Sequence, residues 1–400
     1  MMSKNQQIVF SIILLIFGFV TSCEKLAPAL PNADEVMDGP LEGLTGAENK
    51  RHLEGAAEFD EVYLPETGLG SIFVSNSCVS CHAGVGKGHP STTLTRFGQT
   101  DSTGNKMFHL GAPQLQNRAL LGFQPEMLPV NAGAAKFTPP INAGLGMLEL
   151  VSDADILAMS DPNDADGDGI SGIPNWNHIP NYVHPKPNAM VQNGKYICRF
   201  GKKASVYDLL QQTANAFNQD MGVTSVYEPT DPYTHLEEDP EVSNTNIQKV
   251  VFYLQTLQTP IQRTPNDANI GTGNQLFIKI GCNACHKEML KTGYSPVAAL
   301  SYKTFQPYTD LLLHDMGNDL NDHYTEGSAL TSEWRTPPLW GLGLSPISQG
   351  GDYFLLHDGR ARSIEQAIEM HGGEATNSKN KYLNLTPSEK ANLLQFLKSL

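Results

Sequence analysis

Two pentapeptides constrain the fold of this chain more than any other feature. Both have the pattern C-x-x-C-H, at Cys78-Val79-Ser80-Cys81-His82 and at Cys282-Asn283-Ala284-Cys285-His286. In this pattern the two thiols bond covalently to a c-type haem, and the histidine becomes an axial ligand of the iron. Each half of the chain is therefore expected to fold around a haem. The C-x-x-C pairs could instead bind zinc, but two pairs so far apart, each followed by histidine, fit one zinc site poorly.

Residues 1–22 have the pattern of an export signal. Lys4 precedes an apolar run over residues 8–20, which is too short and wrongly flanked for a confident membrane span. The run ends in Val20-Thr21-Ser22-Cys23, which resembles the lipobox of bacterial lipoproteins. We expect a lipid on Cys23 and a tether over residues 23–55; the alternative is an ordinary signal peptide. The expected location is the bacterial cell envelope, with the protein lipid-anchored and facing the periplasm or the outer membrane.

The remaining cysteine and the composition add few constraints. Cys198 has no partner cysteine left, so a buried thiol is expected rather than a redox role. A formal net charge of −15 argues against nucleic acid as a partner. The 26 prolines and 36 glycines indicate long loops.

Internal repetition predicts two domains, at residues 56–258 and 259–400. The repeated features are an entering helix over Gly70–Ser77 and over Gly273–Gly281, a T-P-P segment followed by G-L-G at 138–146 and at 336–343, and a terminal amphipathic helix over 250–257 and over 393–400. The last helix has a complete start signal, with Thr386 as N-cap, Pro387 at its first position and Glu389 closing a capping box. The expected fold is mainly α, with two cytochrome c-like haem domains and long loops.

An acidic segment in the first half resembles a calcium loop. Asp164, Asp166 and Asp168 alternate, and Gly169 permits the turn that would close an oxygen cage around a cation. The twelfth loop position is Asn175 rather than glutamate, so a standard EF-hand is not completed. The sequence thus predicts a calcium site, with an acidic turn that holds no ion as the alternative.

Several longer motifs resemble a known family. They are Asp161–Gly172, Arg199-Phe200-Gly201, residues 307–317, residues 333–343, His357-Asp358-Gly359-Arg360 and His371-Gly372-Gly373-Glu374-Ala375. Together they resemble the di-haem oxidoreductases, a family associated with peroxidase activity and sometimes called thiol oxidoreductases. That family is similar to bacterial di-haem cytochrome c peroxidases and to the di-haem enzyme that matures the methylamine dehydrogenase cofactor. Nothing in these motifs supports a thiol chemistry.

The resemblance implies a sixth ligand for the second haem. In the relatives, a helix after an H-D-G motif presents methionine or tyrosine to this haem. Residues 365–371 lie at that helix, and His371 falls at the ligand position. The second haem would then be held between His286 and His371, low-spin and suited to electron transfer. Met370 is the alternative ligand, and His371 could instead be purely structural.

The matching helix of the first half, over residues 153–160, has no histidine at that position. We therefore expect the iron bound by His82 to have a sixth position that is open, or readily opened, to peroxide. Other side chains of the first half could fill that position instead: Met159, His89, His109, Met107 and Met127.

Peroxide cleavage also needs a group that takes a proton from one oxygen and returns it to the other. The related peroxidases use a distal glutamate for this. Glu149 is the first candidate, and Glu126 is the second, although its distance from residues 138–140 fits badly. Either could be an ordinary surface or helix-end residue. His314 and His357 are expected to form hydrogen bonds near the haem rather than to bind iron.

Two functions of different class follow. The first is an exported di-haem oxidoreductase, in which electrons enter at the haem of the second domain and reduce peroxide or a related oxidant at the haem of the first. Its expected partners are a small electron-donor protein or a quinol-linked chain, a small oxidant such as hydrogen peroxide, and a membrane contacted only through the lipid. The alternative is a di-haem electron carrier with both irons fully ligated; a sensory or structural haem lipoprotein is a more distant third.

Overall fold

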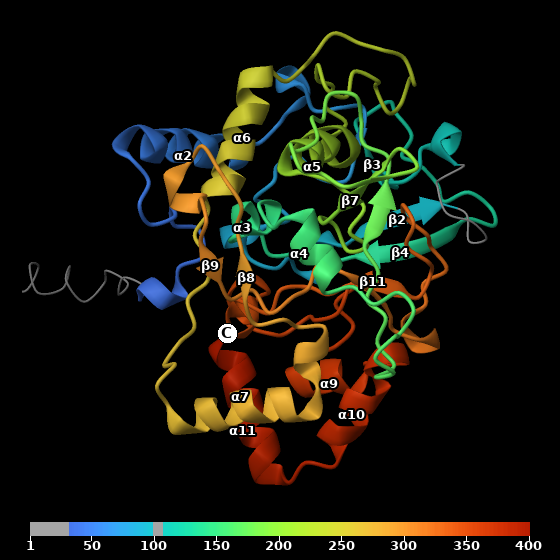
Figure 1. Cartoon of the computed structure of the whole chain (residues 1–400). Coiled ribbons are helices and arrows are strands. Elements are labelled where there is room, and N and C mark those ends of the chain that lie inside the picture. Colours follow the sequence, from blue (N-terminus) through green and yellow to red (C-terminus); the bar gives the residue numbers. More distant parts are fainter. Residues whose placement is uncertain (1–31, 99–106) are drawn as a thin grey trace, which may run out of the picture. The chain divides into compact units, whose positions relative to one another are not determined.

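The computed structural model describes residues 32–98 and 107–400. The chain divides into two compact units, Met1–Val36 and Met37–Leu400. The described part of the first unit contains one 3-10 turn, Ala33–Glu35. The second unit contains all the helices and strands discussed below (Figure 1).

The α-helices of the described residues are mostly short. They are α2 (Gly46–Phe59), α3 (Leu145–Glu149), α4 (Asp153–Ala158), α5 (Leu209–Asn215), α6 (Asn244–Thr256), α7 (Ala268–Ile280), α8 (Ser345–Ser348), α9 (Ile364–Glu369), α10 (Thr376–Leu383) and α11 (Pro387–Ser399). A π-helical turn over Ala216–Asp220 continues α5.

The strands of the described residues form small antiparallel sheets, paired β1–β3, β2–β4, β5–β7–β6, β8–β9 and β10–β11. They are β1 (Ile72–Phe73), β2 (Leu94–Gly98), β3 (Arg118–Ala119), β4 (Gly133–Phe137), β5 (Asn175–Asn177), β6 (Val191–Gln192), β7 (Lys195–Cys198), β8 (Leu290–Lys291), β9 (Thr304–Phe305), β10 (Leu313–Asp315) and β11 (Glu333–Arg335). The longest spans five residues.

The prediction of a mainly α fold with two cytochrome c-like domains is wrong. Helices account for only 34% of the structure and strands for 13%, so the fold is mixed, with several small sheets. The strands escaped the sequence analysis because an alternating pattern needs several residues to be visible. Strands of two to five residues that pair with distant segments leave almost no periodic signal.

Two helix pairs repeat the same close crossing. In the first pair, α2 lies against α6, and a Cβ atom on Gly55 would lie 2.2 Å from the carbonyl oxygen of Lys249. In the second, α7 lies against α11, and a Cβ on Gly273 would lie 2.2 Å from the carbonyl oxygen of Asn392. Each crossing therefore needs glycine at its centre, because any side chain would force the helices apart.

The predicted terminal helices over 250–257 and 393–400 are confirmed as parts of α6 and α11. Helix α11 begins as predicted, with the capping box between Thr386 and Glu389. The G-L-G segments repeat as well. A Cβ on Gly146 would lie 1.9 Å from the carbonyl oxygen of Gln255 in α6, and one on Gly343 equally close to that of Lys398 in α11.

The prediction of an entering helix over Gly70–Ser77 is wrong. This segment contains β1, whose Ile72 and Phe73 pair with β3. The counterpart of α7 is α2, which ends at Phe59. Helix α7 almost reaches its C-x-x-C-H motif, whereas residues 60–77 separate α2 from Cys78. Because of these extra residues, α2 and α7 lie at different distances from their C-x-x-C-H motifs, so aligning the two motifs does not align the two helices.

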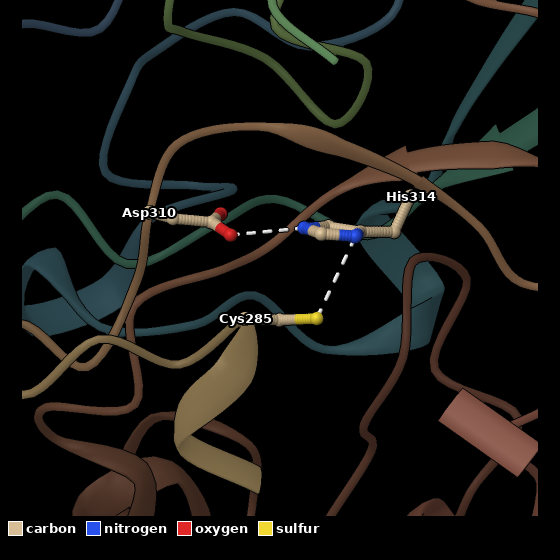
Figure 2. Close-up of side chains that lie close together, drawn as sticks. All are labelled: Cys285, Asp310 and His314. Carbon is tan, nitrogen blue, oxygen red and sulfur yellow. Dashed lines mark hydrogen bonds and ion pairs between the residues drawn. The ribbon is translucent and has the colours of Figure 1, made fainter. Parts of the chain in front are cut away.

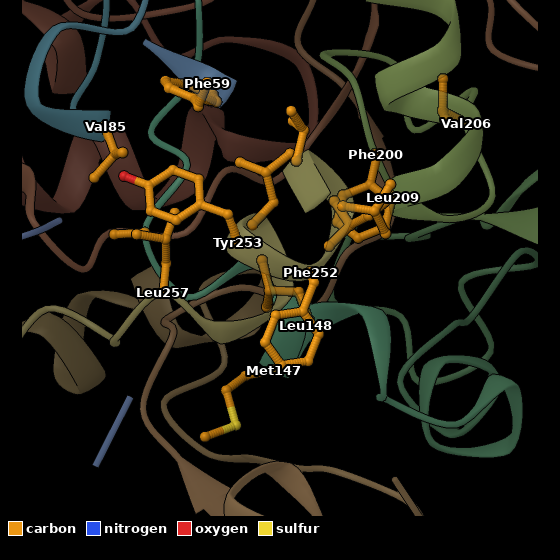
Figure 3. Packing of buried hydrophobic residues seen from close by; sticks show 14 of the residues in the cluster. Phe59, Val85, Met147, Leu148, Phe200, Val206, Leu209, Phe252, Tyr253 and Leu257 are labelled. Atoms are coloured by element: carbon orange, nitrogen blue, oxygen red, sulfur yellow. The ribbon is translucent and has the colours of Figure 1, made fainter. Parts of the chain in front are cut away.

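The core lies around the two helix pairs. The main hydrophobic cluster gathers around α2, α3 and α6, with Phe59, Leu148 and Tyr253 among its members (Figure 3). A second cluster surrounds α7 and α11 and includes Phe277 and Phe396. The predicted boundary between residues 258 and 259 stays a prediction. No helix in the described ranges is long and apolar enough to span a membrane.

Candidate haem sites

The first C-x-x-C-H motif forms a tight turn that brings its thiols and imidazole to one place. The backbone N–H groups of Cys81 and His82 both donate to the carbonyl oxygen of Cys78, at 3.1 and 3.0 Å. The Nδ1 atom of His82 lies 3.0 Å from the carbonyl oxygen of Pro140. Because a carbonyl can only accept, Nδ1 must carry the hydrogen, and the lone pair of Nε2 is left to bind a metal.

The second motif is built in the same way. The N–H of His286 donates to the carbonyl oxygen of Cys282 at 3.0 Å, and its Nδ1 lies 2.9 Å from the carbonyl oxygen of Tyr308. The ring of Phe277 lies 6.4 Å from that of His286, and the ring of Phe59 lies 6.4 Å from that of His82. These phenylalanines follow the glycines of the two helix crossings by one turn, so each crossing positions an aromatic ring against its imidazole.

The donor set of each motif fits a covalently bound haem. Burial lowers the pKa of both His82 and His286 to about 4, so both imidazoles are neutral at neutral pH, the form that binds iron. Cys78, Cys81, Cys282 and Cys285 are free thiols rather than disulfides. Each site thus offers two thiols and one oriented, neutral imidazole within a single turn.

Two short helices reveal the asymmetry between the sites. Helices α4 and α9 each span six residues, start after a serine N-cap and end at a methionine C-cap. The residue after that methionine is Ser160 in the first half and His371 in the second. The Nδ1 of His371 lies 2.6 Å from the carbonyl oxygen of Ala367, which leaves Nε2 to bind a metal. Burial is the main cause that lowers the pKa of His286, and the hydrogen bond to Tyr308 opposes it. His371 lies close enough to lower the pKa of His286 further.

The hydroxyl of Ser160 already has a partner within the protein, and serine has no imidazole to offer. Its Oγ donates to the carbonyl oxygen of Gly172 at 2.5 Å. Among the alternative ligands of the first site, Met159 packs against the main core, and Met127 and His109 are exposed. The Nδ1 of His89 accepts the N–H of Ser91 at 3.1 Å. Met107 lies at the edge of the described residues and precedes the 3-10 turn Phe108–Leu110.

The two candidate proton carriers occupy different surroundings. Glu149 is buried, and its two carboxylate oxygens accept from the N–H of Leu209 and from the amide of Gln255, each at 2.8 Å. Glu126 is half-buried and accepts the N–H of Gln116 at 2.6 Å. Burial raises the pKa of Glu126 to about 7, despite this hydrogen bond.

His314 forms a charged network beside the second motif. Its sequence context predicted only hydrogen bonds near the haem. Its Nε2 lies 2.9 Å from a carboxylate oxygen of Asp310, and its Nδ1 lies 3.5 Å from the sulfur of Cys285 (Figure 2). The same Nδ1 lies 2.7 Å from a carboxylate oxygen of Glu374. Burial opposes protonation of His314, but its bonds to Asp310, Cys285 and Glu374 hold its pKa well above the usual value. Glu374 also accepts from both the N–H and the hydroxyl of Ser171, at the end of the acidic loop.

His357 also forms hydrogen bonds within the protein. Its Nε2 lies 2.7 Å from a carboxylate oxygen of Asp322, and its ring stacks on Trp334 at 3.7 Å. His357 belongs to the H-D-G-R motif, and its carbonyl oxygen accepts the N–H of Thr138 from the first T-P-P segment. The His357 backbone therefore connects the two halves.

The acidic loop brings three carboxylates together, but not the predicted three. One carboxylate oxygen from each of Asp161, Asp164 and Asp166 lies within 4.8 Å of the other two. Asp168 is not part of this group, and its carboxylate accepts the N–H of Ile170. Gly169 has φ +84°, as the predicted turn requires. Calcium at this loop stays a prediction. Of the other cysteines, Cys198 is buried, as expected, and Cys23 and the predicted signal lie outside the described residues.

Comparison with known proteins agrees with the motifs. No curated protein matches the chain. Among solved structures, hydrazine synthase of Kuenenia stuttgartiensis, pressurised with xenon, is 14% identical, with a TM-score of 0.37 over 94% of this chain and 96% of that one. A family model described as "Di-haem oxidoreductase, putative peroxidase" matches residues 129–400. This match covers more than half of the sequence and includes the second C-x-x-C-H motif, the H-D-G-R motif and His371, so the chain belongs to the di-haem oxidoreductase family.

Proposed function

We propose that the protein carries two covalent c-type haems and uses them to reduce hydrogen peroxide or a related oxidant. Cys78 and Cys81 would hold one haem, with His82 on its iron, and the second motif would hold the other in the same way. The oriented Nε2 atoms of the two motif histidines support this assignment.

The observation that carries the proposal is the difference between α4 and α9. At matching positions, the second half offers the oriented imidazole of His371, and the first half offers Ser160, whose hydroxyl is already bonded to Gly172. Two histidines would occupy both axial positions at the second site, which suits electron entry. The first site would keep one axial position for the oxidant. Electrons would therefore pass from the second site to the first.

When bound, the haems supply iron that gains and loses one electron at a time. Reduction of one peroxide to two waters needs two electrons and two protons, so a side chain must handle protons at the first site. Glu149 and Glu126 remain the candidates. Glu126 can gain and lose a proton near neutral pH, since its pKa is about 7. Glu149 would first have to give up its bond to Leu209 or Gln255.

Low-temperature EPR of the oxidised, haem-loaded protein tests the proposal. We expect one high-spin and one low-spin signal. His371→Ala should convert the low-spin signal to high-spin, whereas Met370→Leu, one residue away, should leave both signals unchanged. Covalent attachment is checked separately, because c-type haem stays on the denatured chain and adds to its mass. A denatured chain without haem would contradict the attachment.

Met159 favours the electron carrier as a second candidate. It precedes Ser160 and is half-buried against the main core, against which Cys78 of the first motif also packs, so we propose its sulfur as the alternative iron ligand there. In that case the oxidised protein would give two low-spin signals, and Met159→Leu would turn one of them high-spin. This result would contradict the peroxidase assignment unless reduction of the second haem opened the first.

We also propose the setting in which the protein works. A lipid on Cys23 would anchor it in the cell envelope, and a small electron-donor protein or a quinol-linked chain would supply electrons. Cys23→Ala should move the protein from the membrane fraction to the soluble fraction without changing its haem spectra. If the variant stays in the membrane fraction, the lipid anchor is wrong.

A further inference from the structure

A group of cations lies beside the first haem site without carboxylate partners. The half-buried side chains of Lys87, Lys202 and Arg335 come from three separate segments, and among the described residues none of them forms an ion pair. The guanidinium of Arg335 donates from Nε and one Nη atom to backbone carbonyl oxygens, which leaves its other Nη atom for a ligand. We call these three residues the basic cluster. The chain as a whole has a net charge of −15, so a group of unpaired cations is unusual for it.

Backbone hydrogen bonds fix Lys87 next to His82 and join Lys202 to Arg335. The first T-P-P segment is the centre of this arrangement: Pro140 accepts from the Nδ1 of His82, and Pro139 accepts from the N–H of Gly88, directly after Lys87. A separate backbone hydrogen bond joins the other two members, because the N–H of Arg335 donates to the carbonyl oxygen of Lys202 at 3.0 Å. His82, Lys87 and the Lys202–Arg335 pair are therefore held in place by structure that does not depend on their charges.

The charges of the cluster act on one another and on His82. After burial, the positive charges of Lys87 and Arg335 lower the pKa of Lys202 well below its usual value, and Lys202 in turn lowers the pKa of His82. The charge of Asp358 opposes this effect at Lys87 and Lys202, and that of Asp310, which is bonded to His314, acts on Arg335. Asp358 leaves little of its charge for the cluster. Its carboxylate is already engaged at 2.7 Å by the guanidinium of Arg360. The cluster thus holds more basic groups than there are free carboxylates beside it, and a bound anion would favour the charged form of its lysines.

A buried hydroxyl at the same place also lacks a partner. The side chain of Thr138 is fully buried, and its Oγ1 has no hydrogen-bond partner. It lies against Gly359, next to Asp358, where a Cβ atom would come within 3.2 Å of this oxygen. Cations partly withdrawn from water without a counter-charge and buried hydroxyls without a hydrogen-bond partner both destabilise a fold, and a bound anion with acceptor oxygens would relieve this cost.

We propose that the basic cluster binds the propionate carboxylates of the haem held at His82. This rests on the proposed function, since it requires a haem at that site. A haem carries two carboxylates on one edge, and Lys87 and Lys202 supply ammonium groups near its axial histidine. Arg335 adds a planar guanidinium, which binds carboxylates well. A dissolved carboxylate has the same chemistry, so the experiment must separate the two sources.

An EPR-monitored redox titration of the haem-loaded protein tests the assignment. Lys202→Met and Lys87→Met each remove a positive charge beside the first haem, which favours its oxidised form. We expect the midpoint potential of this haem to fall in both variants while that of the second haem stays unchanged. Lys202→Arg keeps the charge and should restore the wild-type potential. Lys50→Met, which removes an exposed lysine of α2, should change neither potential.

Haem content separates failure of this inference from failure of the proposed function. If the wild-type protein carries no covalent haem, the proposed function is wrong. If Lys202→Met loses the first haem and Lys202→Arg retains it, the inference is supported. The inference is overturned if the lysine-to-methionine variants carry both haems and have the wild-type midpoint potentials. It is also overturned if the potential of the first haem falls in Lys202→Arg as much as in Lys202→Met. A titration with sodium acetate tests whether the cluster binds dissolved carboxylates instead. A saturable change in the spectrum of the first haem that is lost in Lys87→Met would assign the cluster to dissolved anions and overturn the inference.

Discussion

At the scale of single residues, the sites depend on what each polar atom is already bonded to. The carbonyl oxygens of Pro140 and Tyr308 each accept the Nδ1 hydrogen of a motif histidine and so leave the lone pair of Nε2 free to bind a metal. The two candidate glutamates differ in the same way. The carboxylate of Glu149 accepts hydrogen bonds from two other segments, whereas Glu126 has a pKa of about 7 and can change its charge near neutral pH.

Glu126 predicts a pH-dependent stability. Its pKa is near 4.5 in the unfolded chain and about 7 in the fold, because burial favours the protonated acid. Its contribution is therefore complete below pH 4.5 and is lost as the pH rises through 7. Glu126→Gln keeps an acceptor for the N–H of Gln116 and cannot ionise. Relative to wild type, it should be about 1 kcal/mol more stable at pH 8, after discounting for partial exposure, and nearly equal at pH 4.

Thermal unfolding of both proteins at pH 4, 6 and 8 measures this difference. Glu66→Gln, at an exposed glutamate of the same charge, is the matched control. A stability difference between Glu126→Gln and wild type that stays constant over this range would show that Glu126 does not titrate in it.

Glu149 predicts a structural loss that can be distinguished from a catalytic one. Glu149→Ala leaves the buried N–H of Leu209 and the amide of Gln255 without an acceptor and should lower the free energy of unfolding by about 2–3 kcal/mol. Glu149→Gln retains one acceptor oxygen and should lose less. If Glu149→Gln keeps wild-type stability and haem spectra but loses peroxide turnover, the carboxylate acts on protons at the first site. Full turnover in this variant would leave it a structural role alone.

At the scale of helices, the two crossings predict that one glycine of α7 is essential and its neighbour is not. Gly273→Ala would place its Cβ 2.2 Å from the carbonyl oxygen of Asn392 and 2.6 Å from the Cβ of Phe396. The helices must separate, at a cost of about 1–3 kcal/mol. Gly271→Ala, two residues away, meets nothing within 4 Å and should stabilise α7 by up to about 1 kcal/mol.

Differential scanning calorimetry of the two variants checks this prediction. The Phe277 ring, one turn after Gly273, lies against His286, so Gly273→Ala should also disturb the spectrum of the second haem. Equal unfolding temperatures for both variants would contradict the tight crossing.

The helices also show what the sequence could and could not predict. Helix α11 was predictable because its capping signals and apolar spacing are all local. Helix α2 was missed because residues 60–77 separate it from its motif. Ile72-Phe73 precedes Cys78 at the same distance at which Leu276-Phe277 of α7 precedes Cys282, but Ile72-Phe73 lies in β1. Sequence patterns alone predict haem roles for the motif cysteines and His371, and these roles stay predictions. The basic cluster could not be predicted from such patterns, since only the fold brings Lys87, Lys202 and Arg335 together.

At the scale of the whole molecule, side chains from both predicted domains share one interior. Phe137 of β4 packs in one cluster with Tyr324 and Trp334. A buried ion pair joins Arg96 of β2 to Glu326. These contacts, together with the backbone bond between Thr138 and His357, connect the two halves far from the predicted boundary at residue 258.

We therefore predict that residues 259–400 do not fold alone. Cutting at 258 would expose Trp334 and Tyr324 to water and leave Glu326 without Arg96, while the cluster around α7 and α11 would be the main core that remains. Exposing each large apolar side chain costs about 1.5–3 kcal/mol, which is a large share of the stability of a typical domain. The fragment should show a broad, non-cooperative thermal transition, whereas the whole chain should show a sharp one. A fragment with a sharp transition and a bound haem would instead support two independent domains that meet at residue 258.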